Sequence, residues 1–476
     1  MIYIPSKPQA IAHDFLLKTP DAFLLMGMGL GKTATIVDLI NELTHERFDI
    51  NGTLVVAPIR VCNLTWPAEV QKYDQFRHLK VANLREEAGR KAFMRGSADI
   101  YLINWESLRT VARLLAKKTS GKVPYDMVVF DESTKGKSPY SLRTAEYKTY
   151  CPRVSRHIAM TGTPSPNSLM DLWGQMSLVD GGKRLGKSAS HFQQTFFRKH
   201  RWNPYKWEVE PDAKERIYKR ISDVTLTLKS SDWLDLPDVV MEDVDVVMPP
   251  ALVAQYKQFE ADLITQIRGE DITAVNSAAL ITKLLQFTSG AIYDEDKVAH
   301  HVHDLKINAL RETAKRAGGP VLVAYAYQHE KERIRKAFPQ AEFMSDAKSA
   351  KDQVALMARW NAGKVKMLVA HPASMSHGLN MQGQNRLIWF SLTYNRDFYE
   401  QMLGRLYRRG QDQVVYCYRL MVPGSVDWAV AEALRYKADE EGMLLAALQN
   451  LAAFRASGGV ITIDPEEGLD DDLSDL

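Results

Sequence analysis

A glycine-rich loop constrains the fold of this chain more than any other feature. The stretch from Met26 to Thr33 reads MGMGLGKT, follows the apolar run Phe23–Leu25, and precedes a helix-like run from Ala34 to Leu43. A strand, a glycine-rich turn, Lys-Thr and a helix, in that order, form a cradle for phosphate groups. Inward-turned backbone N–H groups and the helix N-terminus favour negative charge there. Lys32 is therefore expected to reach the β- and γ-phosphates of a nucleotide.

The loop departs from the usual phosphate-binding pattern at one position. That pattern has Gly or Ala five residues before Gly31, where this chain has Met26. On this stretch alone, an ordinary glycine-rich turn remains the alternative interpretation.

Length and composition predict a globular protein of two or three domains. The chain has 476 residues, of which 45% are hydrophobic and 25% are charged. It has no apolar run of about 20 residues and no visible signal peptide, so we expect no membrane contact. Its three cysteines are far apart in the sequence. They suit a reducing compartment, which predicts a cytoplasmic protein, or a nuclear one if the source is eukaryotic.

The charge is distributed unevenly along the chain. Seven acidic residues and no basic residue lie between Asp464 and Leu476, although the net charge of the whole chain is +3. The rest of the chain is therefore basic, which is compatible with a polyanionic partner. A solvated surface with an acidic tail explains the charge equally well.

Short apolar runs followed by turns and helical patterns recur along the chain and predict an α/β fold with parallel sheets. A region of different character separates two sets of these runs. We therefore predict a first lobe over residues 1–235, with a basic–aromatic insertion over about 180–235, a second lobe over 236–450, and a disordered acidic tail over 451–476. The predicted strands are Phe23–Leu25, Leu54–Ala57, Ile100–Ile103, Met127–Phe130, His157–Met160, Val321–Tyr325, Lys366–Ala370, Leu387–Phe390 and Val414–Leu420.

Polar residues that directly follow these strands are the candidates for chemistry, because ligands bind beyond the carboxyl ends of parallel strands. Asp131 and Glu132 follow one run, with Asp131 placed to hold Mg²⁺ and Glu132 to deprotonate an attacking water. A helix N-cap with a first-turn acid is the structural alternative. Thr161-Gly162-Thr163 follows the next run, where small hydroxyls would sense a γ-phosphate. A proline-bounded loop is the alternative there.

Two arginines lie three positions apart near the end of the second lobe. Arg405 and Arg408 are predicted to share one face of a helix. Arginine suits a contact to a phosphoryl group in the transition state, because it is always charged and its donors form a fork. A solvated basic helix is the alternative for this segment.

The order of the motifs resembles helicase superfamily two, and specifically the SWI/SNF-like family of DNA-translocating ATPases. That family also lacks the upstream glycine in its phosphate loop. The resemblance covers about residues 7–420 and is carried by Lys7-Pro8-Gln9, the loop ending at Thr33, Val56-Ala57-Pro58, Asp131-Glu132-Ser133-Thr134, Met160-Thr161-Gly162-Thr163-Pro164, Gly378-Leu379-Asn380 and Gln401 to Gln411.

The resemblance implies two tandem RecA-like lobes with ATP in the cleft between them. It implies catalytic roles for Glu132, Asp131, Lys32, Arg405 and Arg408, and Mg²⁺ binding by Thr33 and Asp131. Thr161, Gly162 and Thr163 would couple hydrolysis to DNA binding. The residues implied to bind the nucleotide are Gln9, Gly27, Met28, Gly29, Leu30, Gly31, Lys32, Thr33, Gly378, Asn380 and Gln401.

The implied function is ATP-dependent translocation on double-stranded DNA by a minimal motor of phage or bacterial type. A helicase that separates or anneals strands, acting on forked or single-stranded DNA, is one alternative. A non-catalytic, nucleotide-gated DNA-binding scaffold is another. Two departures from the family pattern are Thr134, where the family usually has His, and the run from His371 to His377, where it usually has Ser-Thr-x-Ala-Gly.

Three further segments are candidates for binding. Residues 57–66 and 104–106 are candidates for DNA contact in the first lobe. The stretch Arg198–Trp207 could contact a DNA groove, or could be a surface hairpin whose tryptophans pack on the lobe. The run His300-His301-Val302-His303 is interpreted as a solvated turn rather than a metal site, because no other ligands are nearby in sequence.

Overall fold

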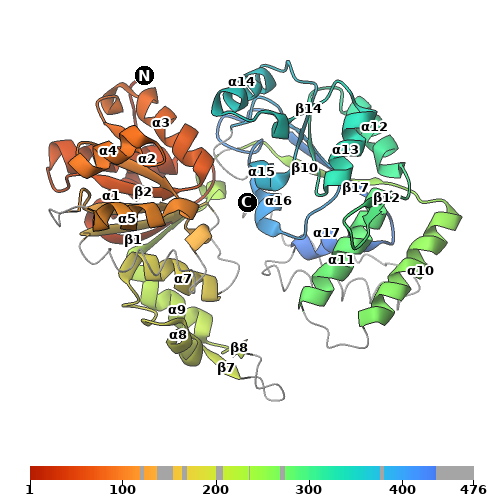
Figure 1. Cartoon of the computed structure of the whole chain (residues 1–476), viewed down its shortest axis with the longest axis horizontal. Coiled ribbons are helices and arrows are strands. Elements are labelled where there is room, and N and C mark those ends of the chain that lie inside the picture. Colours follow the sequence, from red (N-terminus) through yellow and green to blue (C-terminus); the bar gives the residue numbers. More distant parts are fainter. Residues whose placement is uncertain are drawn as a thin grey trace. The chain divides into compact units, whose positions relative to one another are not determined.

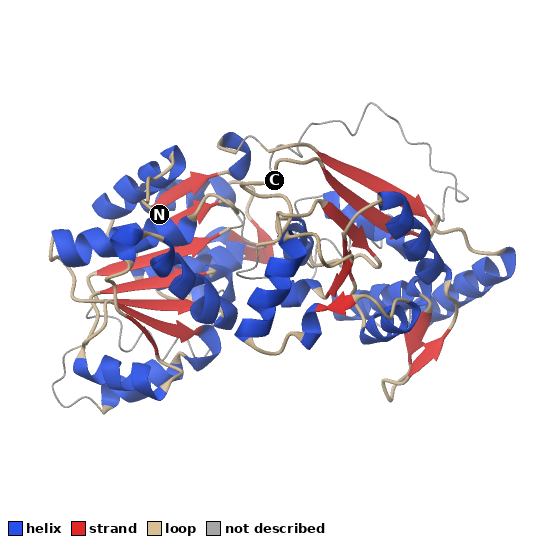
Figure 2. Ribbon diagram, turned by 90° about the horizontal axis from the view of Figure 1, so that it is seen from above, coloured by secondary structure: helices blue, strands red, loops and turns tan. Residues whose placement is uncertain are grey.

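The computed structural model describes residues 1–117, 123–136, 154–162, 169–199, 207–234, 236–267, 274–375 and 380–435. The chain divides into two units, with the boundary between Leu234 and Asp235. Each unit is built on a parallel sheet flanked by helices, and Figure 2 shows the red strands of each sheet beside blue helices. The predicted α/β fold with parallel sheets is confirmed.

The sheet of unit 1 has seven strands, all parallel to their neighbours. Their order across the sheet is β3 (Val81–Asn83), β4 (Ile100–Asn104), β2 (Thr53–Ala57), β5 (Met127–Asp131), β6 (Arg156–Thr161), β1 (Asp21–Met26) and β9 (Thr225–Leu228).

Both faces of this sheet are buried. Along β1, Phe23 and Leu25 belong to one hydrophobic cluster, whereas Leu24 and Met26 belong to another. This alternation follows from the two-residue period of a strand and explains why the strand is apolar throughout. The helices of unit 1 are α1 (Lys7–Lys18), α2 (Lys32–Asn41), α3 (Trp66–Lys72), α4 (Glu87–Arg95), α5 (Arg109–Ala116), α7 (Leu169–Asp180), α8 (Ala189–Phe196) and α9 (Ala213–Ile221).

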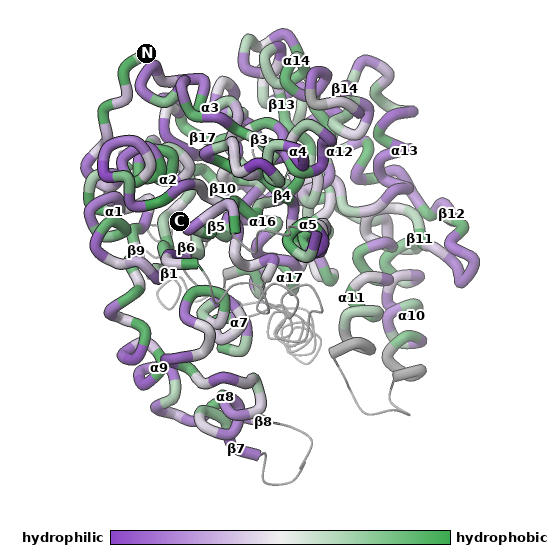
Figure 3. The backbone as a smooth tube through the Cα atoms, turned by 60° about the vertical axis from the view of Figure 1, so that its left-hand side comes forward, coloured by the Kyte–Doolittle hydropathy of each residue, from purple (hydrophilic) through white to green (hydrophobic). Residues whose placement is uncertain are grey.

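Helices α7, α8 and α9 form a helical part of unit 1 that carries a small antiparallel hairpin (Figure 1). The hairpin pairs β7 (Phe197–Lys199) with β8 (Trp207–Val209). Figure 3 shows β7 as a hydrophilic segment. Most of the predicted basic–aromatic stretch lies outside the described residues, but Arg198, Lys199 and Trp207 lie on the two strands of this hairpin.

Unit 2 has a six-stranded parallel sheet. Its order is β10 (Val239–Asp245), β17 (Val415–Met421), β16 (Arg386–Trp389), β13 (Val321–Ala324), β15 (Met367–Ala370) and β14 (Glu342–Phe343). Its helices are α10 (Pro250–Ile267), α11 (Ala274–Ser289), α12 (Leu305–Ala317), α13 (Gln328–Ala337), α14 (Ala350–Asn361), α15 (Pro372–Met375), α16 (Arg396–Leu403) and α17 (Val426–Arg435).

The histidine run of unit 2 is partly a strand rather than a turn. His300 and His301 lie on β12 (Ala299–His301), which pairs with β11 (Ala291–Tyr293). The Nε2 atom of His300 lies 2.7 Å from Oδ2 of Asp294, so that histidine has a carboxylate partner.

Among the described residues, no helix is long and apolar enough to cross a membrane.

Candidate nucleotide site

The glycine-rich loop connects the end of β1 at Met26 to the start of α2 at Lys32. Two of its glycines have backbone angles that side chains disfavour, with φ of 84° at Gly29 and 87° at Gly31. Gly31 is also the N-cap of α2. The glycines therefore shape a loop that leads directly into the first turn of a helix, as a phosphate cradle requires.

Two neighbouring segments leave no room for side chains on this loop. A Cβ atom on Gly31 would lie 2.4 Å from Nε2 of Gln9, and one on Gly27 would lie 2.2 Å from Oγ of Ser230. Nε2 of Gln9 also donates to the carbonyl oxygen of Gly31 at 3.4 Å, and its Oε1 accepts from the amide and the hydroxyl of Ser6. Gln9 is therefore held against the loop from α1.

The side chain of Lys32 lies within the loop itself. Its Nζ donates to the carbonyl oxygen of Met26 at 2.8 Å and to that of Gly27 at 3.4 Å. Thr33 is half-buried in the first turn of α2. The ammonium group is thus held beside the loop, where phosphate oxygens would compete with carbonyl oxygens for it.

Asp131 lies at the end of β5, two strands from β1 in the sheet. The register pairs Asp131 with Met160 on β6 and Thr161 with Leu25 on β1. The carboxyl ends of three adjacent strands therefore bring Asp131, Thr161 and the loop to one edge of the sheet.

Two indole N–H groups hold Asp131. Nε1 of Trp66 donates to its Oδ2 at 3.0 Å, and Nε1 of Trp105 donates to its main-chain oxygen at 3.0 Å. Asp131 is only 7% exposed. Burial raises the pKa of its carboxyl, whereas the Trp66 hydrogen bond and the charge of Lys32 oppose that rise.

The burial of two tryptophans limits which residues of the candidate DNA-contact segments can reach DNA. Segments 57–66 and 104–106 are candidates for DNA contact from the sequence, but Trp66 and Trp105 are buried, with exposed fractions of 0% and 6%. Their side chains face Asp131 and are not available to a nucleic acid. Neither the apolar character of these residues nor their spacing predicts this contact, because the partner is 65 or 26 positions away.

Glu132 has a strained backbone. Its φ of 55° places it in the left-handed region, which it shares with only Phe48 and Lys297 among the described residues other than glycine. Such a conformation costs of order 1–3 kcal/mol and is common at functional sites. Oε1 of Glu132 accepts a hydrogen bond from Oγ1 of Thr134 at 3.4 Å. Thr134, at the position where the family usually has His, therefore contacts Glu132.

The next residue links the site to the helical part of unit 1. Ser133 is fully buried, and its hydroxyl donates to Oε1 of Gln175 on α7 at 2.8 Å. Gln175 is also buried, and its Nε2 donates to the main-chain oxygen of Asp171. Gln175 is not predictable from the sequence, because a lone glutamine in a helix has no local signal.

The segment after β6 approaches the loop closely. Thr161 is 1% exposed at the end of β6. A Cβ atom on Gly162 would lie 3.1 Å from Cγ of Met28 and 3.2 Å from Nζ of Lys32. Thr161 and Gly162 thus lie beside the loop, whereas Thr163 lies outside the described residues.

The predicted helix through the two arginines of unit 2 is wrong. Helix α16 ends at Leu403, so Arg405 and Arg408 lie in the turns that follow it. Arg405 is 7% exposed and Arg408 is half-buried. Gln401 is on α16 and buried, Asn380 is exposed, and Gly378 lies outside the described residues.

The side chain of Gln411 stabilises the turns that contain Arg405 and Arg408. Its Nε2 lies within hydrogen-bonding distance of three carbonyl oxygens, those of Gln382 at 3.1 Å, Gln384 at 3.0 Å and Leu406 at 3.2 Å. The amide of Met381 donates to the carbonyl oxygen of Arg405 at 3.2 Å. Backbone hydrogen bonds and the Gln411 side chain therefore both hold the turns around Arg405.

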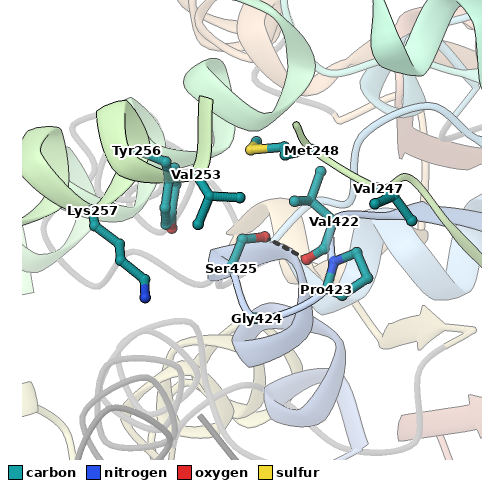
Figure 4. Close-up of a pocket in the computed structure, with 9 residues that line it drawn as sticks. All are labelled: Val247, Met248, Val253, Tyr256, Lys257, Val422, Pro423, Gly424 and Ser425. Atoms are coloured by element: carbon teal, nitrogen blue, oxygen red, sulfur yellow. Dashed lines mark hydrogen bonds between the residues drawn. The ribbon is translucent and has the colours of Figure 1, made fainter. Parts of the chain in front are cut away.

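A small cavity of about 220 Å³ lies elsewhere in unit 2 and contains none of the predicted site residues (Figure 4). Two of its lining residues are hydrogen-bonded to each other, since the hydroxyl of Ser425 donates to the carbonyl oxygen of Val422. The residues lining it are mostly apolar: Val247, Met248, Val253, Tyr256, Lys257, Val422, Pro423, Gly424 and Ser425.

Comparisons with known proteins agree with the motifs. The sequence matches the SNF2-related domain over residues 19–290 and the helicase conserved C-terminal domain over residues 305–410. It is 33% identical over 466 residues to protein p41 of Acyrthosiphon pisum secondary endosymbiont phage 1, which covers 94% of this chain and 99% of the phage protein.

More distant relatives are longer than this chain. A DNA repair and recombination protein RAD54-like of Gallus gallus is 24% identical over 469 residues, 86% of this chain and 62% of the relative. An ATP-dependent helicase of Mycoplasma genitalium is 22% identical over 437 residues, 86% of this chain and 39% of the relative.

Among solved structures, the SWI2/SNF2 ATPase core of Sulfolobus solfataricus in complex with double-stranded DNA is similar at a TM-score of 0.45. The two are 22% identical, and the match covers 96% of this chain and 94% of that one. Together with the two matched domains, the phosphate loop and the acidic residues after β5 lead to one conclusion. This chain belongs to the SNF2-related family of helicase-like ATPases.

Proposed function

We propose that this protein uses ATP hydrolysis to translocate on double-stranded DNA without extensive strand separation. One observation carries the proposal: Lys32, Asp131 and Thr161 meet the phosphate loop at one edge of a parallel sheet, in a chain of the SNF2-related family. The relative named as a DNA repair and recombination protein supports DNA as the partner.

The residues of unit 1 suit a magnesium–nucleotide complex. Gly29 and Gly31 have positive φ in a loop that leads into the first turn of α2, and the ammonium group of Lys32 is held by carbonyl oxygens that phosphates can replace. We assign Gln9 to the adenine edge and Thr33 and Asp131 to Mg²⁺. The metal, when bound, neutralises charge on the β- and γ-phosphates. Glu132 accepts a proton from the attacking water.

Unit 2 supplies the remaining groups in this proposal. Arg405 and Arg408 contact the phosphoryl group from the second lobe, and such arginines accelerate hydrolysis by roughly 10³–10⁵. Gly378, Asn380 and Gln401 contribute to nucleotide binding. The first lobe in this proposal spans residues 1–235 and the second lobe spans residues 236–450. A cytoplasmic location stays a prediction.

The central test is the rate of ATP hydrolysis with duplex DNA, with single-stranded DNA and without DNA. Stimulation by duplex is expected. A hydrolysis rate that neither duplex nor single-stranded DNA changes would contradict the proposal that DNA is the partner. An absence of hydrolysis would favour the scaffold alternative.

A second assay separates the translocase from the helicase. Displacement of a third strand from a triplex, without separation of a forked duplex, is expected for a translocase. Separation or annealing of the forked duplex would favour the helicase alternative.

A further inference from the structure

Two buried tryptophans from different segments of unit 1 converge on one residue, Asp131. Trp66 is the first residue of α3, and its indole bonds the carboxylate. Trp105 begins the 3-10 helix η4 (Trp105–Ser107), and its indole bonds the main-chain oxygen. One residue is thus held at both its side chain and its backbone by rigid, neutral donors.

The two segments begin at the same edge of the sheet as the phosphate loop. Trp66 follows the carboxyl end of β2 by a short connection, and Trp105 directly follows the carboxyl end of β4. Strand β2 lies between β4 and β5 in the sheet. Each segment also reaches the surface at a side chain that can donate a hydrogen bond to a phosphate, because Asn63 and Arg109 are exposed. Each segment therefore has one end on the surface and an indole on Asp131.

The connection before Trp66 has an unusual local structure. Residues Val61–Thr65 form a π-helix, and the amide of Trp66 donates to the carbonyl oxygen of Val61. A π turn contains more residues per turn than an α-helix and is frequent at functional sites. It changes the helical face on which the following residue lies, and here that residue is the one that bonds the carboxylate.

The two hydrogen bonds determine different aspects of the site. The Trp66 bond occupies Oδ2 of Asp131 and so orients the carboxylate. The Trp105 bond orients the peptide group that joins Asp131 to Glu132, whose φ is 55°. The Trp105 ring also stacks on Phe130, with centroids 5.7 Å apart. A shift of the Trp66 segment would therefore reorient the Asp131 carboxylate, and a shift of the Trp105 segment would reorient the peptide group that precedes Glu132.

We propose that Trp66 and Trp105 are positioning residues that couple DNA contact at the exposed residues of the segments 58–65 and 106–109 to the geometry of Asp131 and Glu132. This inference rests on the proposed function, because it takes DNA as the activating partner. DNA that binds the outer ends of these segments would align the acidic pair through the indoles and so raise the rate of hydrolysis.

The test compares W66F, W105F and the control W173F in the full chain. Each change removes one indole N–H from a buried ring. Trp173 on α7 is a matched control, because it is 3% exposed and its indole donates to the carbonyl oxygen of Gly186 at 2.9 Å, away from Asp131. Five quantities are measured. Three are the kcat and KM for ATP, each with and without duplex DNA, and the DNA dissociation constant. The other two are the Mg²⁺ concentration for half-maximal binding of a fluorescent ATP analogue and the midpoint of thermal unfolding.

The ratio of DNA-stimulated to basal kcat is expected to fall about tenfold in W66F, which loses a bond to a charged acceptor, and about fivefold in W105F. W66F should also need more Mg²⁺ for nucleotide binding. The DNA dissociation constant should stay near the wild-type value in both, and W173F should keep the wild-type ratio.

Three outcomes would overturn the inference. The first is a wild-type stimulation ratio in W66F and W105F. The second is an equal loss of basal and stimulated rates, which would indicate a purely structural role. The third is the same loss in W173F. If W66F does not fold, W105F decides the question alone, because it reaches Asp131 from the other segment. A wild-type protein that DNA does not stimulate would instead contradict the proposed function.

Discussion

The hydroxyl of Ser230 donates a hydrogen bond to the carbonyl oxygen of Met28 at 2.7 Å, across 202 positions of sequence. A second bond runs from the amide of Gly27 to the carbonyl oxygen of Leu228 at 2.8 Å. The segment after β9 therefore supports the phosphate loop directly. That segment ends at Leu234, where unit 1 ends.

Replacing Ser230 by alanine should weaken ATP binding. The loss of one hydrogen bond costs about 1 kcal/mol, so KM for ATP should rise about fivefold with little change in kcat. Steady-state hydrolysis measures both constants. Ser231→Ala is the control, because Ser231 is exposed and its hydroxyl bonds only to Asp232 in the described contacts. A similar rise in KM for the control would contradict this role for Ser230.

Glu132→Gln should bind ATP normally and hydrolyse it at least about a hundredfold more slowly, because the amide cannot accept the proton of the attacking water. Binding of a fluorescent ATP analogue and steady-state hydrolysis test this expectation. Lys32→Ala provides the contrast, since it should weaken binding itself. Near-normal hydrolysis by Glu132→Gln would exclude Glu132 as the base.

The backbone of Glu132 allows a separate test of stability. Glycine adopts positive φ readily, whereas alanine does not. Glu132→Gly should therefore have a free energy of unfolding about 1 kcal/mol higher than Glu132→Ala. Denaturant unfolding of the two variants measures the difference, and the reverse order would show that the φ of 55° is not retained in solution.

Arg405→Ala should lose most of its hydrolysis and keep ATP binding, because Arg405 is proposed to act on the transition state. Gln411→Ala should share this pattern in weaker form, since the Gln411 amide lies among three carbonyl oxygens around the Arg405 turn. The ratio of kcat to the wild-type value measures both effects. Gln413→Ala is the exposed control. Equal activity of the Gln411 and Gln413 variants would contradict this role for Gln411.

Acid should destabilise unit 2 through His329. Burial, with a smaller effect of the Arg333 charge, lowers the pKa of His329 to about 4, and its ring stacks on Tyr327. The unfolded chain binds this proton below about pH 6.5, and the folded protein does not. The contribution of this group to the free energy of unfolding is therefore fully present above pH 6.5. It is lost as the pH falls toward 4, by up to about 1.4 kcal/mol per pH unit.

His329→Phe should reduce this pH dependence and keep the ring stacking. Thermal unfolding midpoints between pH 7.5 and pH 5 measure the slope. The slope should not vanish, because burial lowers the pKa of His303 to about 4 as well. His191→Gln, at an exposed position of unit 1, is the control and should leave the slope unchanged. An unchanged slope in His329→Phe would contradict the assignment.

Local sequence patterns predicted much of the fold. All nine predicted apolar runs overlap parallel strands, because a strand buried on both faces is apolar at most of its positions. The edge strand β10 was not predicted. It is partly exposed along its length and carries Glu242, Asp243 and Asp245, of which Asp243 pairs with Arg419 on β17. Short strands such as β3 and β14 have too few residues to form a pattern.

What the sequence determined by itself is the set of chemically active residue types and their positions after strands. A glycine-rich turn, a Lys-Thr pair and an Asp-Glu pair can be recognised because they stand directly after apolar runs, and neighbouring residues are enough to define them. Only the tertiary structure decided what surrounds them. Trp66, Trp105, Gln175 and Ser230 act through hydrogen bonds that span 26 to 202 positions. Such contacts arise when sheet order brings distant segments together, and no short-range pattern in a single sequence contains that order.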